Sequence, residues 1–165
     1  MQLGPALLVD RRSLGRGLIA ALAVPFLLAA CGASASAQAM IVHRDPGCGC
    51  CHAWATALQR SGRFDVSVLD ESDMSAIKQR YGVPSGLVSC HTAAAAGYVI
   101  EGHVPAQDIL RLLRERPRAV KGLAVAGMPI GSPGMETPGG AREAFDVVAF
   151  GAHGEQQIYA HYTAA

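Results

Sequence analysis

Three cysteines fall within the four residues from Cys48 to Cys51, and a fourth cysteine stands at Cys90. Such a cluster suits three kinds of chemistry: binding of soft metal ions, thiol–disulfide exchange, or structural disulfides. Among common metals, thiolate ligands select Cu(I), Zn(II) or iron–sulfur clusters. The spacing of the thiols, together with the helices and strands predicted around them, must therefore decide among these three kinds of chemistry.

The spacing favours copper over structural zinc. A structural zinc site usually draws on two separated pairs of Cys or His residues, whereas Cys50 and Cys51 are adjacent. Adjacent residues cannot easily direct both sulfurs at one tetrahedral ion, but their thiolates can bridge several Cu(I) ions. We therefore expect Cu(I) as the bound metal, and a polynuclear thiolate cluster is the arrangement that the adjacent cysteines favour.

Histidines and methionines elsewhere in the chain add candidate ligands. His91 directly follows Cys90, and His103 lies in a Gly-His-Val-Pro segment where we expect an exposed loop. Methionine thioethers are soft ligands, although methionine more often fills gaps in a core. The candidate metal ligands are Cys48, Cys50, Cys51, Cys90, His91, His103, Met128 and Met135. Glu101 is a candidate to orient a ligand histidine, with a solvated carboxylate as the alternative.

The first 37 residues have the pattern of a signal peptide, which leaves residues 38–165 as the folded domain. Arginines at positions 11, 12 and 16 precede an apolar run from Leu18 to Ala30 that is too short to span a membrane. We therefore expect export to the periplasm.

Two cleavage sites compete within this segment. Leu28-Ala29-Ala30-Cys31 resembles a bacterial lipoprotein signal, in which Cys31 would carry a lipid, and Ala35-Ser36-Ala37 resembles an ordinary cleavage site. In both cases Cys31 is lipidated or removed, so four cysteines remain free. A lipid on Cys31 would be the only expected link to a membrane.

Composition excludes several classes of function. The formal net charge is +1 and only 16% of the residues are charged, so there is no basic field to attract nucleic acid. The chain has no serine elbow, no paired-carboxylate motif and no phosphate-binding glycine loop. These absences argue against a hydrolase and against a conventional enzyme.

Hydrophobic periodicity predicts the order β-α-β-α-β-β-α followed by further strands. Trp54, Ala57 and Leu58 recur at helical spacing after Cys51 and should face the core. The residues from Gly122 to Gly140 leave little room for regular structure. The expected strands are 39–44, 64–69, 87–92 (which would carry Cys90), 97–102, 145–150 and 156–162, and the expected helices begin near Cys51, Asp73 and Pro105.

This order predicts an α/β fold of the thioredoxin-like type, with a mixed central sheet flanked by helices and a C-terminal β extension. Cys48-x-x-Cys51 lies between a strand and a helix, where thioredoxin-like proteins carry their redox pair. Pro84 precedes a predicted strand, where that fold places a cis-proline, but the sequence alone does not decide whether this bond is cis.

Five segments resemble the signature blocks of a bacterial periplasmic metal-binding family, the CopG-type copper-resistance proteins. They are Asp45–Cys51, Gly82–Pro84, Ser89–Thr92, Gly97–Pro105 and Gly127–Glu136, in that order. The resemblance implies a thioredoxin-like fold, Cu(I) binding by the three clustered cysteines with the later one, and a role in copper resistance and homeostasis. Other periplasmic copper-handling proteins would be its partners.

Two alternatives remain beside a copper-binding protein. Cys48 and Cys51, with Pro84, could serve a thiol–disulfide oxidoreductase in which Cys48 is the attacking thiol; the third thiol, Cys50, counts against it. Structural disulfides are the other alternative, and the plausible set is Cys48–Cys51 with Cys50–Cys90.

Overall fold

The computed structural model describes residues 36–165, which form one mixed sheet of seven strands with three α-helices. The predicted lipoprotein cysteine and most of the predicted signal peptide lie outside the described residues and stay predictions. The strands are β1 (Gln38–Arg44), β2 (Phe64–Asp70), β3 (His91–Ala95), β4 (Tyr98–Glu101), β5 (Gly122–Ala124), β6 (Phe145–Phe150) and β7 (Gln156–Tyr162). The helices are α1 (Gly49–Arg60), α2 (Met74–Tyr81) and α3 (Ala106–Glu115).

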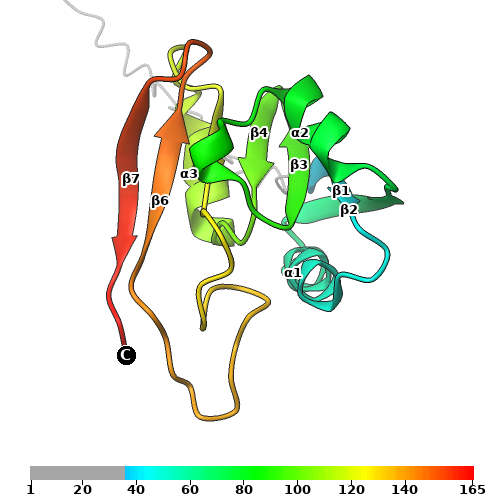
Figure 1. Cartoon of the computed structure of the whole chain (residues 1–165), viewed down its shortest axis with the longest axis vertical. Helices are drawn as coiled ribbons and strands as arrows, with labels where there is room; N and C mark the ends of the chain where they lie inside the picture. The colour runs from blue at the N-terminus through cyan, green and yellow to red at the C-terminus, as the bar shows by residue number, and fades with distance from the viewer. Residues whose placement is uncertain (1–35) are drawn as a thin grey trace, which may run out of the picture. The chain divides into compact units, whose positions relative to one another are not determined.

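The strand order across the sheet is β2-β1-β3-β4-β5-β6-β7 (Figure 1). β1 pairs parallel with β2 and β4 parallel with β5, while the other neighbouring pairs are antiparallel. The predicted α/β class, the element order and the C-terminal β extension are therefore confirmed.

Helices cover both faces of the sheet. α1 and α3 bury Trp54, Leu58, Ile109 and Leu112 against strand residues such as Ile100 in the larger core cluster. The opposite face carries α2, whose Tyr81 packs against a smaller cluster of buried apolar residues that includes Leu87 and Phe150. Trp54 and Leu58 thus face the core as predicted, whereas Ala57 is exposed and Ala55 is buried in its place.

One predicted strand starts later than expected. The strand expected over 87–92 begins only at His91, so Cys90 directly precedes β3 instead of lying inside it. Leu87 belongs to a short 3-10 turn (Ser85–Leu87), and the backbone N–H of Ser89 donates to the Glu101 carboxylate instead of to a neighbouring strand. Side-chain bonding thus replaces the strand ladder in this segment.

A short strand, β5, lies inside the region expected to be irregular. Gly122 allows it, because a Cβ atom at that position would collide with the Val99 backbone oxygen and the Phe150 ring. The remainder of the segment, residues 125–144, is a long connection that runs at the same end of the molecule as α1 (Figure 1).

The peptide bond before Pro84 is trans, and residues 36–165 contain no cis peptide bond. Pro84 precedes the 3-10 turn and adopts an extended conformation, with φ −61° and ψ 138°. The cis-proline that a thioredoxin-like site would place here is therefore absent from this part of the chain.

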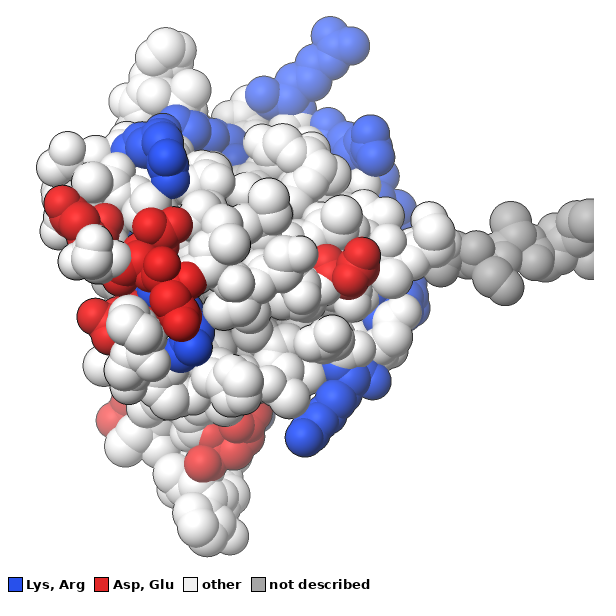
Figure 2. Space-filling view, turned by 90° about the vertical axis from the view of Figure 1, so that its right-hand side faces the viewer, with Lys and Arg blue, Asp and Glu red and all other residues white. Residues whose placement is uncertain are grey.

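Charged side chains form small groups on the side of the molecule drawn in Figure 2, and most of that surface carries neither Lys and Arg nor Asp and Glu. This view agrees with the low charge of the sequence. Across the portion that the structure describes, none of the helices combines the length and hydropathy needed to cross a membrane.

Candidate metal centre

The first part of the site is the turn that leads from β1 into α1. Cys48 is the N-cap residue of α1, and its sulfur accepts the backbone N–H of Cys51 at 3.4 Å. The Asp45 carboxylate accepts the N–H of Gly47 at 2.7 Å, and Arg44 donates to the Cys48 carbonyl oxygen at 3.3 Å. These contacts hold the cysteines over the positive end of the α1 dipole, which favours thiolates.

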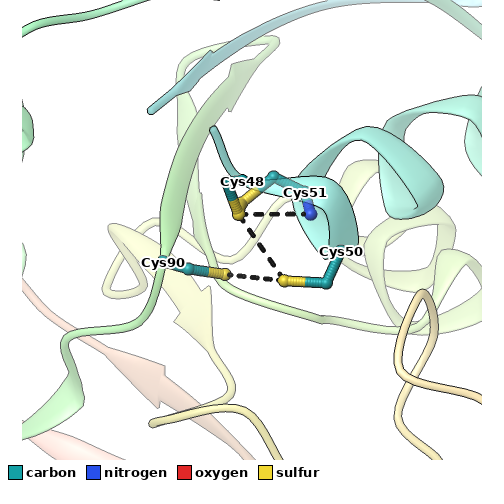
Figure 3. Close-up of side chains that lie close together, drawn as sticks. All are labelled: Cys48, Cys50, Cys51 and Cys90. Atoms are coloured by element: carbon teal, nitrogen blue, oxygen red, sulfur yellow. Dashed lines mark hydrogen bonds between the residues drawn. A yellow bond between two sulfur atoms is a disulfide. The ribbon is translucent and has the colours of Figure 1, made fainter. Parts of the chain in front are cut away.

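The sheet brings the fourth cysteine to the same place. His91 pairs with Arg44 across β1 and β3, so Cys90 lies beside the turn that carries the other three. The Cys48 and Cys50 sulfurs are 3.5 Å apart, and the Cys50 and Cys90 sulfurs are 4.0 Å apart (Figure 3). All four sulfurs lie within 4.8 Å of one another, a grouping that could hold a metal ion.

The sulfurs are not equivalent in oxidation state. Cys48 and Cys51 form a disulfide, and their Cα atoms are 5.4 Å apart. Cys50 and Cys90 are the free thiols of the described chain. The structure thus contains one of the two bridges expected for structural disulfides, and the same bridge is the resting pair expected for a redox protein.

Two histidines lie against the Cys90 sulfur. Its distances are 3.1 Å to Nε2 of His103 and 3.4 Å to Nδ1 of His91. Nδ1 of His103 donates to the Pro133 carbonyl oxygen at 2.8 Å, so Nε2 is the nitrogen that faces the thiol with its lone pair. Both predicted histidine ligands are therefore at the site.

The two histidines are buried, so the prediction of an exposed loop around His103 was wrong. The His91 ring packs on Trp54 with 4.4 Å between ring centroids, and Trp54 donates to the Val104 carbonyl oxygen at 3.0 Å. Burial, with smaller contributions from His103 and Lys78, lowers the pKa of His91 to about 3. Burial likewise lowers the pKa of His103. Both rings are neutral at physiological pH and can act as ligands.

The pKa of the Cys90 thiol is shifted in the opposite direction to the pKa values of the two histidines. Burial, followed by the proximity of the Cys50 thiol, raises the pKa of Cys90 to about 11. Without a metal, Cys90 therefore holds its proton at neutral pH. A cation that binds this sulfur must displace the proton.

A buried ion pair supports the segment that carries Cys90. The Glu101 carboxylate accepts from Lys78 Nζ at 2.6 Å, from the Thr92 hydroxyl at 2.7 Å and from the Ser89 N–H at 2.7 Å. Burial raises the pKa of Glu101, and Lys78 opposes that shift. Glu101 thus orients the backbone next to Cys90, and neither the expected histidine contact nor a solvated carboxylate is found.

The connection between β5 and β6 covers the cluster. The thioether of Met128 is 4.0 Å from the Cys50 sulfur, and this methionine is 53% exposed. The contact of Met135 within this connection is made by its backbone, whose N–H donates to the Ser132 carbonyl oxygen at 2.8 Å. Of the two predicted methionine ligands, the structure therefore brings the Met128 sulfur to the thiols.

Several residues that surround the cysteines could not be recognised from the sequence. Lys78 occupies an ordinary position in a short amphipathic helix, Ser89 lies in a predicted strand, and Pro133 contributes only a backbone oxygen. Only the chain path brings them to the cysteines. The sequence motif itself pointed to the residues that carry sulfur and imidazole.

Comparison with known proteins identifies the family. The profile of the family described as "Protein of unknown function, DUF411" matches residues 87–135. No curated protein matches the chain. A solved structure described as "Copper resistance protein copG- Form 2" is 45% identical, with a TM-score of 0.72, over 76% of this chain and 98% of that chain. Form 1 of that protein gives the same identity and TM-score over 77% and 98%. With this identity over nearly the whole of both solved chains, the protein belongs to the CopG-type copper-resistance family.

Proposed function

We propose that this protein binds Cu(I) through Cys48, Cys50, Cys51 and Cys90 and serves copper resistance in the periplasm. The observation that carries the proposal is the convergence of four cysteine sulfurs within 4.8 Å. The relatives named as copper-resistance proteins support copper as the metal. The predicted signal peptide supports the compartment.

The sulfur spacing favours more than one copper ion. Two thiolates on one metal, each with a bond of about 2.3 Å, lie roughly 4 Å apart. The successive distances from Cys48 to Cys50 and from Cys50 to Cys90 are 3.5 and 4.0 Å. Each neighbouring pair of sulfurs can therefore share an ion, which makes Cys50 the bridging ligand of a polynuclear cluster.

Copper loading on all four sulfurs requires the disulfide to open. Reduction of Cys48–Cys51 takes two electrons and two protons and yields two thiols, which then lose their protons to the solvent as Cu(I) binds. A dithiol reductant of the compartment would supply the electrons. The protein would therefore hold copper only in its reduced form.

We also propose that β1 to α3 is a thioredoxin-like unit. Its strand order is β2-β1-β3-β4. The pair β1–β2 is parallel and the hairpin β3–β4 is antiparallel, which supports this assignment. The cysteine turn lies between β1 and the N-terminus of α1, as expected for that fold. Strands β5 to β7 would then be the extension.

Anaerobic titration of the purified, phosphine-reduced protein with Cu(I) tests the metal assignment, with the bound copper measured by elemental analysis. We expect several ions per chain, fewer in Cys50→Ser and Cys90→Ser, and an unchanged number in His52→Ala. His52 is the matched control because it is exposed and adjacent to Cys51. Wild-type protein that binds no copper would rule out the proposal.

A thiol–disulfide oxidoreductase is the second candidate, and the Cys48–Cys51 bridge at the start of α1 favours it. Cys48 is partly exposed while Cys51 is buried, so a dithiol substrate would attack Cys48. Turnover in an insulin-reduction assay that disappears in Cys48→Ser would support this function. Copper binding without any such turnover would leave the metal function alone.

A further inference from the structure

We propose that Cys90, His91 and His103 form a second metal site, which takes a borderline divalent cation such as Zn(II) while Cys48 and Cys51 are joined in a disulfide. These three residues already offer one donor atom each within 4.8 Å of the others. The site shares Cys90 with the copper cluster and differs from it in its two imidazole donors. Imidazole with thiolate is a donor set that suits Zn(II).

The distances fit such an ion with little rearrangement. A sulfur and a nitrogen bound to one tetrahedral Zn(II), at about 2.3 and 2.0 Å, lie roughly 3.5 Å apart. The Cys90 sulfur is 3.1 Å from Nε2 of His103 and 3.4 Å from Nδ1 of His91. Small outward movements of the two rings would admit the ion.

His103 is oriented as a ligand before any ion binds. Its Nδ1–H donates to the Pro133 carbonyl oxygen at 2.8 Å, which directs the Nε2 lone pair at the Cys90 sulfur. A backbone carbonyl in this position is the usual partner of a metal-binding imidazole. The ring is fully buried, so its orientation is set by the fold.

His91 supplies an independent observation. It is fully buried, and Nε2 is one of the few buried side-chain atoms within residues 36–165 that has no hydrogen-bond partner. Burying an imidazole nitrogen without a hydrogen-bond partner costs free energy, so this ring calls for an explanation. Its Nδ1 faces Cys90, and Trp54 and His103 pack against the ring. A cation bound at Nδ1 would place the ring proton on Nε2 and add a metal–nitrogen bond that offsets part of the cost of burial, although Nε2 itself would still have no partner.

The disulfide decides which donors are available. With Cys48 and Cys51 bonded to each other, the remaining thiols of the described chain are Cys50 and Cys90, 4.0 Å apart. Two thiols and two imidazoles then remain as donors. Cys50 can approach as a fourth ligand beside Cys90, His91 and His103. Reduction adds two thiolates and shifts the balance to Cu(I). The competition of two metals for Cys90 rests on the proposed function, whereas the divalent site does not.

Cobalt(II) is the probe for this site, because it reports sulfur and imidazole ligands in its absorption spectrum. The purified protein would first be checked by alkylation and mass spectrometry for an intact Cys48–Cys51 bridge and two free thiols. It would then be titrated anaerobically with Co(II) chloride. We expect one Co(II) per chain, a thiolate-to-cobalt charge-transfer band in the near ultraviolet, and tetrahedral ligand-field bands in the visible.

Variants assign the ligands. Cys90→Ser should abolish the charge-transfer band, and His103→Ala should weaken Co(II) binding by at least about tenfold, since loss of even an outer-sphere partner has such an effect. His52→Ala is the matched histidine control and should bind like the wild type. Circular dichroism would establish that each variant is folded. If His103→Ala is unfolded, Cys90→Ser still tests the site, because it hardly alters the side-chain volume.

The outcomes are distinct. No Co(II) binding by the oxidised wild type, or an unchanged band in Cys90→Ser, would overturn the divalent site. Cu(I) titration of the same preparations after reduction tests the copper cluster separately. If both metals bind, Cu(I) added after reduction should displace Co(II) and remove its band; retention of cobalt beside a full copper load would contradict the shared use of Cys90.

Discussion

Lys78 Nζ lies 2.6 Å from a carboxylate oxygen of Glu101, and both side chains are buried beside the segment that carries Cys90. The same carboxylate accepts the Ser89 N–H, so this ion pair connects α2 to the residue before Cys90. Buried pairs of this kind are costly to break one partner at a time, because the remaining charge is left without compensation.

Glu101→Gln should therefore destabilise the protein by about 3–5 kcal/mol in urea denaturation. The double change Lys78→Met with Glu101→Leu should recover much of that loss, since it removes both charges. Arg114→Gln is the control, because Arg114 forms an exposed pair with Glu115 and its loss should cost at most about 1 kcal/mol. Equal effects of Glu101→Gln and Arg114→Gln would show that the buried pair contributes nothing special.

Acid should destabilise the metal-free protein through His91. Its pKa is lowered from an ordinary value of 6.5 to about 3 in the fold. Between these values the unfolded chain binds a proton that the folded protein does not, so stability is lost as the pH falls from about 6.5 toward 3. One proton gives a slope of up to about 1.4 kcal/mol per pH unit.

Urea denaturation at a series of pH values, in the presence of a chelator, measures this slope. His91→Gln should flatten the profile, because glutamine does not titrate. The shifts of Glu101 and His103 are common to both proteins and cancel in their difference. Parallel profiles for wild type and variant would contradict the assignment to His91.

Met128 should stabilise bound copper, because its thioether is 4.0 Å from the Cys50 sulfur. Met128→Leu keeps the volume of the side chain and removes the soft donor, so the folded state should be unaffected. We expect Cu(I) to pass to a competing chelator a few-fold more readily, which corresponds to on the order of 1 kcal/mol. Met135→Leu is the matched control and should behave like the wild type.

Gly134 should be needed for the loop to cover the cluster. Its φ is +85°, and a Cβ atom there would come within 2.8 Å of the Cys50 carbonyl oxygen and 2.9 Å of the Trp54 backbone nitrogen. Gly134→Ala should cost about 1–3 kcal/mol through strain and overpacking. The fluorescence of Trp54, the only tryptophan of the chain, should change as the loop moves away.

Gly139→Ala is the control for that change. A Cβ atom added at Gly139 would have no neighbour within 4 Å, and this glycine does not have a positive φ. Its substitution should leave both the melting temperature and the Trp54 fluorescence close to those of the wild type. A similar loss of stability in both variants would show that the close packing of Gly134 on α1 is unimportant.

Much of the fold follows from local sequence. Alternating and helical hydrophobic patterns predicted the order of helices and strands, including β6 and β7, with bounds close to those observed. The patterns failed where tertiary contacts override local preference. β5 exists because Gly122 permits a close approach of Val99 and Phe150, and the strand before Cys90 is replaced by bonds to Glu101.

The donor atoms of the candidate site could also be predicted from the sequence, because sulfur and imidazole have few alternative uses when they are clustered. The sequence by itself determined the thiols, their spacing and the histidines that follow. Only the tertiary structure decided that Cys90 lies 4.0 Å from Cys50, that His103 is buried with Nε2 facing Cys90, and that Lys78 and Pro133 belong to the surroundings. These relationships join residues far apart in the chain, and they depend on strand pairing and on the path of loops, for which no local pattern in the sequence carries a signal.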